Sequence, residues 1–104
     1  MSKIQLGSNI ALVRKNMNIS QGELAEAVKV TQSYLSQIES GNKEASISLL
    51  EKICKKLRVP VGCIHMLSIT KEEVPEERQF IWEKLNPVIR DLIKSIYPEK
   101  LSGL

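Results

Sequence analysis

The side chains of this chain that could do chemistry are amides and hydroxyls gathered in one short segment. They are Gln32, Ser33, Ser36 and Gln37. At about 100° per residue of an α-helix they share one uncharged face, and Leu35 and Ile38 lie on the opposite face. A primary amide carries a donor and an acceptor in one plane, which matches the major-groove edge of adenine. The spacing therefore predicts a helix whose polar face reads bases in double-stranded DNA.

Acids, bases and metal ligands are scattered along the chain instead of gathered. His65 is the single histidine, and Cys54 and Cys63 each lie within an apolar helical pattern. Such cysteines are expected to act as small buried hydrophobes rather than as a disulfide, a metal site or a redox sensor. No glycine-rich phosphate loop, nucleophile elbow or pair of carboxylates is present in the sequence. We therefore expect no enzyme activity, no metal and no cofactor.

The composition favours one small folded domain with a short appended element. Of 104 residues, 42% are hydrophobic and 26% charged, and the net charge is +3. No apolar run approaches the roughly 18 residues that span a bilayer, and the start lacks a signal-peptide core. We expect no membrane contact and a reducing, cytoplasmic setting.

The charge is unevenly distributed along the chain. Residues 1–69 carry nine basic and five acidic side chains, whereas residues 70–104 carry six basic and seven acidic. An anionic partner is therefore expected to meet residues 1–69. On charge alone, a mildly basic solvated surface explains the same numbers equally well.

Three helices are predicted to build and position the polar face. Apolar residues at intervals of four, three and four predict an amphipathic helix over about 4–15. Ser20 and Glu23 form a capping box at the start of a second helix. Thr31 is placed to cap a third helix over 32–39 that carries the amides.

Two further helices are predicted to close the core. Gly41 ends the third helix in a left-handed conformation. Ser46 caps the fourth helix, and Pro60 leads into a short fifth helix over 61–67. Two short helices joined by three residues and flanked by packing helices form a helix-turn-helix arrangement. We expect an all-α fold.

Three segments of the chain match the pattern of a known family. They are residues 20–25, residues 31–41 with their closing Ile-Glu-Ser-Gly, and residues 49–54. Together they resemble the lambda-repressor-like, Xre/Cro-type DNA-binding domain, over residues 7–67. The resemblance implies a five-helix domain and a transcription regulator, here a repressor that occupies a palindromic operator as a dimer.

The resemblance also implies roles for individual residues. Gln32, Ser33 and Gln37 match base-contacting positions of the family, and Ser36 joins them through its place on the same face. The candidates for contact with DNA phosphates are Gln21, Tyr34, Asn42 and Lys43. Tyr34 is placed at the rim of the helix, where covering the edge of the core is the stronger alternative.

Two further positions concern how the helices are held. Arg14 and Glu39 match a partly buried ion pair of the family, and both flank apolar stripes. Removing one partner of a desolvated pair costs about 3–5 kcal/mol. Lys29 stands where the family often has glycine, so the turn must accept a side chain at a positive φ. Ser33 is shorter than the glutamine common there and reaches fewer base edges.

A second group of cations lies on or after the fourth helix. They are Lys52, Lys55, Lys56 and Arg58. A solvated helix face is the first interpretation, and additional phosphate contacts are the alternative.

The last third of the chain is more than a five-helix domain needs. Pro75 and the Asn86-Pro87 pair predict two helices, near 75–85 and 87–97. Apolar side chains form stripes along both helices: Ile81, Leu85, Val88, Ile89, Leu92, Ile93 and Ile96. Burying them is worth several kcal/mol at about 25 cal/mol per Å².

Such stripes predict a partner. We expect a DNA-binding domain over 1–69 and a dimerisation element of one or two helices over 70–104 that pairs with its twin as a homodimer. One alternative is that the stripes pack on the core of their own chain. Another is an antitoxin or regulatory adaptor whose tail binds a different protein, with DNA binding secondary.

Overall fold

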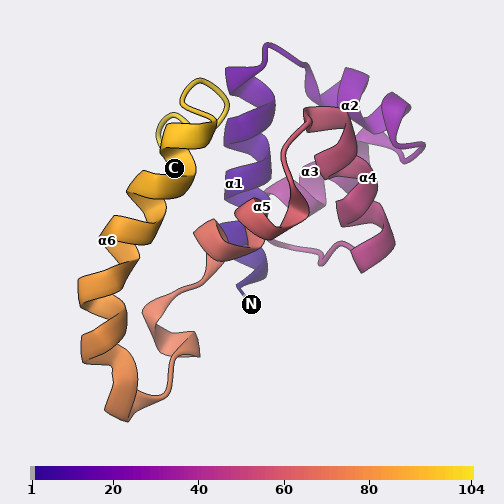
Figure 1. Cartoon of the computed structure of the whole chain (residues 1–104). Helices are drawn as coiled ribbons and strands as arrows, with labels where there is room; N and C mark the ends of the chain where they lie inside the picture. Colours follow the sequence, from indigo (N-terminus) through magenta and orange to yellow (C-terminus); the bar gives the residue numbers. More distant parts are fainter. Residues whose placement is uncertain (1) are drawn as a thin grey trace.

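The computed structural model describes residues 2–104, which form helices and turns and contain no strand. The α-helices are α1 (Lys3–Asn16), α2 (Gln21–Ala27), α3 (Gln32–Glu39), α4 (Ile47–Leu57), α5 (Val61–Ser68) and α6 (Gln79–Ile96). Two short 3-10 turns, η1 (Lys71–Glu73) and η2 (Glu76–Arg78), precede α6. In Figure 1, helices α1–α5 form one group and α6 lies beside α1, away from α2–α4. The predicted all-α fold is confirmed.

Side-chain caps fix where four of the helices begin. The capping residues are Ser2, Ser20, Thr31 and Ser46, and each hydroxyl accepts a hydrogen bond from the backbone N–H three residues later. At α2 the carboxylate of Glu23 also accepts from the backbone N–H of Ser20, which completes the predicted capping box. Each such cap is worth about 1 kcal/mol. The local sequence therefore sets the first residues of α2 and α3.

A single buried cluster unites the first five helices. Ile10, Leu24, Leu35, Ile53 and Ile64, one from each helix, are fully inaccessible to solvent. Because α3 contributes its apolar side to this cluster, its polar side must face outward.

α1 approaches the end of α3 closely enough to require glycine. A Cβ at Gly7 would lie 2.1 Å from the backbone oxygen of Ile38. Asn9, also on α1, is buried and donates to the backbone oxygen of Leu67 and the hydroxyl of Ser68, both at 3.1 Å. α1 is thereby fixed to α3 on one side and to the end of α5 on the other.

Of the one or two helices expected in the tail, the structure has one α-helix. The predicted break at Asn86-Pro87 is wrong, because α6 runs unbroken from Gln79 to Ile96 with Pro87 inside it. Proline removes the N–H that would bond the carbonyl of residue 83, and water can satisfy that carbonyl where the helix side is exposed. Glu83 and Pro87 are both exposed. Pro75 also differs from its predicted place, since it precedes η2 instead of lying in the first turn of the tail helix.

The C-terminal segment packs on the same core. Ile93 and Leu101 belong to the buried cluster of α1–α5. The amide of Asn16 donates to the backbone oxygens of Lys100 and Ser102, at 3.0 and 2.9 Å. Of the predicted dimer contacts, Ile93 is therefore covered by its own chain, and only 9% of it is exposed. No helix within residues 2–104 combines the length and the apolar character that crossing a bilayer requires.

Candidate nucleic-acid interface

α3 presents its polar side chains to solvent. Gln32, Ser33 and Ser36 are exposed and Gln37 is half-buried. Leu35 and Ile38 on the opposite side are buried. The side-chain oxygen of Gln32 lies 3.4 Å from where a Cβ of Gly22 would stand, so the beginnings of α2 and α3 are adjacent. The four residues predicted to contact bases thus share the outward face of one helix.

Arg14 and Glu39 form the predicted ion pair. Nε of Arg14 donates to Oε2 of Glu39 at 2.8 Å, and a second guanidinium N–H donates to Oε1 at 2.9 Å. Both side chains are more than nine-tenths buried, and the third guanidinium nitrogen donates to the backbone oxygen of Ile19. A bidentate pair in which every guanidinium nitrogen donates a hydrogen bond is a favourable geometry for a buried charge. It fixes the last turn of α3 to α1.

Gln21 joins this network at the start of α2. Its amide nitrogen donates to Oε1 of Glu39 at 3.2 Å, and the side chain is half-buried. A primary amide carries two N–H donors. One is directed at the carboxylate, and the other remains for an acceptor such as a phosphate oxygen. Glu39 therefore orients the side chain that the sequence predicts at the DNA backbone.

The loop after α3 brings three of the other predicted residues together. Gly41 has φ +83, and a Cβ there would lie 2.8 Å from the Cα of Ile4, so this turn requires glycine. Asn42 and Lys43 follow, both exposed. The ammonium of Lys43 lies 5.6 Å from the ring centroid of Tyr34, within the range of a cation–π contact. Tyr34 itself packs against the buried cluster, as the alternative interpretation expected.

The turn between α2 and α3 has the strain that the sequence indicated. Lys29 adopts φ +61. Two other non-glycine residues, Asn18 and Arg58, also have positive φ, and neither was predicted from the sequence. For an L-residue this conformation costs about 1–2 kcal/mol. Lys29 and Arg58 therefore occupy positions that glycine would fill more easily.

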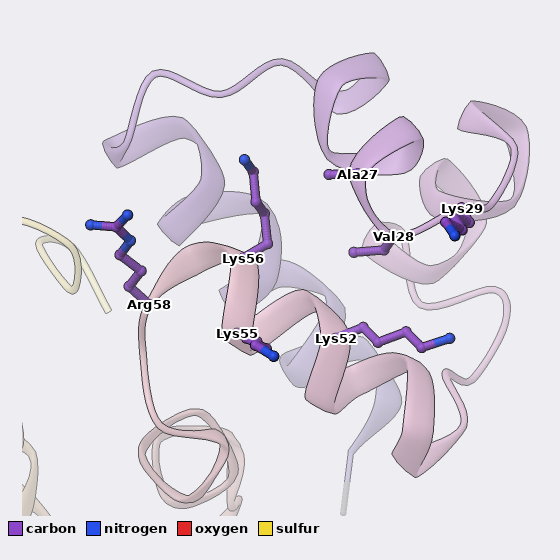
Figure 2. A pocket seen from close by; sticks show the side chains of 7 residues that line it. All are labelled: Ala27, Val28, Lys29, Lys52, Lys55, Lys56 and Arg58. Atoms are coloured by element: carbon purple, nitrogen blue, oxygen red, sulfur yellow. The ribbon is translucent and has the colours of Figure 1, made fainter.

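A basic hollow beside this turn was missed by the sequence analysis. Its volume is about 500 Å³, and its lining residues are Ala27, Val28, Lys29, Lys52, Lys55, Lys56 and Arg58. Figure 2 shows the end of α2 on one side and the lysines of α4 on the other. The spacing of positions 52, 55 and 56 places them on one helix face. Their proximity to Lys29 depends on tertiary packing, which the sequence does not display.

The cysteines and the histidine stand outside these surfaces. Cys54 is buried, and burial, with a smaller contribution from nearby Cys63, raises the pKa of its thiol to about 11. The thiol is therefore protonated at neutral pH and packs as a small apolar group. His65 is half-buried on α5. Within residues 2–104, no group of three His, Cys, Asp or Glu side chains is arranged to hold a metal ion.

Two short helices joined by a tight turn, with the second one exposing amides and hydroxyls, define a helix-turn-helix DNA-binding module. The family model for helix-turn-helix proteins matches residues 10–62. The chain belongs to this family, whose members here are DNA-binding regulators of transcription and not enzymes.

Curated relatives support this assignment. The chain is 39% identical over 93 residues to the HTH-type transcriptional regulator SinR of Bacillus subtilis (strain 168), covering 86% of this chain and 78% of SinR. It is 32% identical over 95 residues to the immunity repressor protein of Bacillus phage phi105, covering 86% of this chain and 66% of that repressor. The chain thus spans about two thirds of the length of the phage repressor.

A solved structure shares the fold as well. The clp gene regulator ClgR from Corynebacterium glutamicum aligns with a TM-score of 0.63 and 26% sequence identity. The alignment covers 91% of this chain and 94% of that chain. The similarity therefore extends past α5 into the C-terminal third.

Proposed function

We propose that this chain is a sequence-specific repressor that binds a palindromic operator as a homodimer, with α3 in the major groove. The observation that carries the proposal is the exposed polar face of α3 on a helix held at its end by a buried ion pair. A side chain reads a base edge only when its backbone is held still against the DNA, because hydrogen-bond geometry tolerates little displacement. The Arg14–Glu39 pair supplies that fixation.

The proposed contacts divide into two kinds. Gln32, Ser33, Ser36 and Gln37 read base edges from α3. Gln21 at the start of α2 and the Asn42–Lys43 loop meet phosphates on either side, with Tyr34 supporting Lys43. Phosphate contacts set the register and the general affinity, and base contacts set the choice of sequence. A repressor acts in this scheme by occupying the operator.

The case for a dimer rests on the outer side of α6. Ile81, Leu85, Val88, Leu92 and Ile96, which we call the outer stripe, are each 43–66% exposed. Their spacing of four, three, four and four residues places them along one side of the helix. Ile81 and Leu85 of the stripe also line a hollow of about 300 Å³, together with Trp82 and the half-buried Ile89. A second copy could place its own stripe there, and such a self-complementary contact closes with two-fold symmetry.

Selection of bound sequences from a random pool of DNA duplexes tests the proposal. A dimer with two recognition helices should enrich a two-fold palindrome whose half-sites are about 34 Å, or one helical turn, apart. Enrichment of a single half-site would contradict the dimer, and absence of any enriched sequence would contradict sequence-specific binding.

A second candidate function follows from the exposed apolar side chains of α6. Phe80 is 60% exposed at the start of α6 and projects off the outer stripe. An antitoxin or adaptor would use this apolar surface to hold a different protein, with DNA binding secondary. Light scattering on the purified chain separates the two cases. A dimeric mass supports the repressor. A monomeric mass that gives way to a complex of fixed stoichiometry with a co-expressed partner supports the adaptor.

A further inference from the structure

The basic hollow has a charge pattern that the proposed function does not use. Five of its seven lining residues are cationic, none is acidic, and each of the five is exposed. The ion pairs found within residues 2–104, Arg14–Glu39 and Lys71–Glu83, involve none of these five cations. Lys55 and Lys56 lie in the last turn of α4, where they offset the helix dipole. Lys52, in the middle of α4, has no such role.

Backbone strain makes two of these cations harder to explain as ordinary surface charge. Lys29 and Arg58 line the hollow, and both have left-handed backbone, at φ +61 and +56. Glycine would adopt these conformations without the clash between Cβ and the following carbonyl. Strain of this kind is concentrated at positions where a particular side chain serves a function. The hollow thus has two cations at positions that disfavour any side chain.

The floor of the hollow indicates what kind of anion fits. Ala27 and Val28 at the end of α2 lie between Lys29 and the lysines of α4 (Figure 2). Phosphate groups themselves offer no apolar contact to these two residues, and in a DNA backbone only the carbons of the sugars do. A peptide that places an aliphatic side chain between carboxylates can cover the two apolar residues and also pair with the cations around them. The volume of about 500 Å³ also lies within the range of ligand pockets.

We propose that the basic hollow is a docking site for an acidic segment of another protein, with one aliphatic side chain on Ala27 and Val28 and flanking carboxylates on Lys29, Lys52 and Lys56. The hollow lies at the C-terminal end of α2, whereas Gln21 lies at its N-terminal end. Lys29 also precedes Gln32 by three residues, so simultaneous binding of the docked segment and DNA is part of the proposal and is tested below. A regulator with such a site brings an acidic partner to the DNA that it occupies.

Titration of the ¹⁵N-labelled full chain with a synthetic peptide of repeated Glu-Glu-Leu tests the site. We expect saturable shifts of the backbone amides of residues 27–29 and 52–58. The same peptide with Gln in place of Glu should cause none. An excess of random-sequence DNA duplex should leave the shifts in place. Displacement by the duplex would overturn the proposal and make the hollow part of the DNA interface, and non-saturable shifts would overturn it as a specific site.

A charge-matched pair of variants makes the test specific to the hollow. The double substitution Lys52→Gln and Lys56→Gln should weaken peptide binding about ten-fold or more, because each lysine loses a charge-assisted contact. Lys15→Gln with Lys84→Gln removes the same charge from exposed positions elsewhere and should leave binding within about two-fold. Equal weakening in both variants would show a general charge effect and overturn the site. Because DNA binding by α3 is measured separately, this proposal can fail while the proposed repressor function stands.

Discussion

α3 and α6 are both anchored to the core by a narrow apolar side, and they differ in what they expose. α3 buries Leu35 and Ile38 and exposes amides and hydroxyls to solvent. α6 buries Ile93 and exposes the outer stripe to solvent. Polar side chains are solvated without a partner, whereas exposed aliphatic area is favourable only when something covers it. The proposed DNA contact therefore needs no further coverage of α3 within the single chain, whereas the proposed dimer would cover the outer stripe of α6.

The two helices also differ in how they are held. α3 ends in a buried bidentate ion pair, and the start of α6 is joined to η1 by the exposed pair Lys71–Glu83. Position matters more than the presence of a pair, because buried partners are costly to separate and exposed ones are screened by water. A fixed α3 suits base reading, and a less constrained start of α6 suits an adaptable interface.

The largest expected effect is on the buried pair. Arg14→Ala should lower the free energy of unfolding by about 3–5 kcal/mol, because the carboxyl group of Glu39 would be left without its partner in a desolvated site. Urea denaturation followed by circular dichroism measures this. Lys71→Ala provides the matched control at the exposed pair and should leave the denaturation midpoint almost unchanged. Similar losses in both variants would contradict the contrast between the two helices.

The next effect concerns the outer stripe. Leu92 is 66% exposed, so Leu92→Ala should leave the folded chain intact and weaken the proposed dimer by about 1.5–3 kcal/mol per side chain buried. Analytical ultracentrifugation over a range of concentrations measures the dissociation constant. Ser95→Ala, also exposed on α6, is the control and should have no effect. An unchanged dissociation constant for Leu92→Ala would place the dimer contact elsewhere or exclude it.

A smaller effect is expected at the polar face of α3. Gln32→Ala should weaken binding to the preferred operator by about 1–3 kcal/mol and binding to random DNA hardly at all. Fluorescence anisotropy on both duplexes provides the comparison, and Ser8→Ala on the exposed side of α1 is the control variant. Equal losses on both duplexes would remove Gln32 from the base contacts and assign it to phosphates.

The parts that the sequence predicted are those set by local chemistry. Ser20 with Glu23, and Thr31, cap α2 and α3 as predicted, because a cap depends on residues three positions apart. The Arg14–Glu39 pair was predicted through the family resemblance and is present. Base and phosphate contacts remain predictions, since they depend on DNA.

The parts that the sequence missed depend on tertiary packing. Pro87 indicated a break, but α6 continues through it because exposure and the flanking turns tolerate one lost hydrogen bond. Ile93 and Val88 belong to one apolar arc in the sequence, and only the packing of α6 against the buried cluster decides which is covered. The basic hollow likewise requires α2 and α4 to meet, which no spacing within either helix reveals.

The smallest effect tests whether the strained turn beside α3 serves the fold. Lys29→Gly should raise the free energy of unfolding by about 0.5–1 kcal/mol, since relief of the left-handed strain exceeds the added entropy of the unfolded chain. Thermal denaturation measures it, and Lys15→Gly on α1 should instead destabilise by about 1 kcal/mol because its φ is helical.

If Lys29→Gly is more stable but binds the acidic peptide more weakly, the lysine side chain contributes to binding in the hollow and not to folding. Operator affinity should fall only slightly, because one cation is lost outside the proposed contacts of α3. A loss of stability in Lys29→Gly would contradict this interpretation. It would mean that the lysine side chain packs on the turn that sets the angle between α2 and α3, which would make the polar face of α3 dependent on a residue outside it.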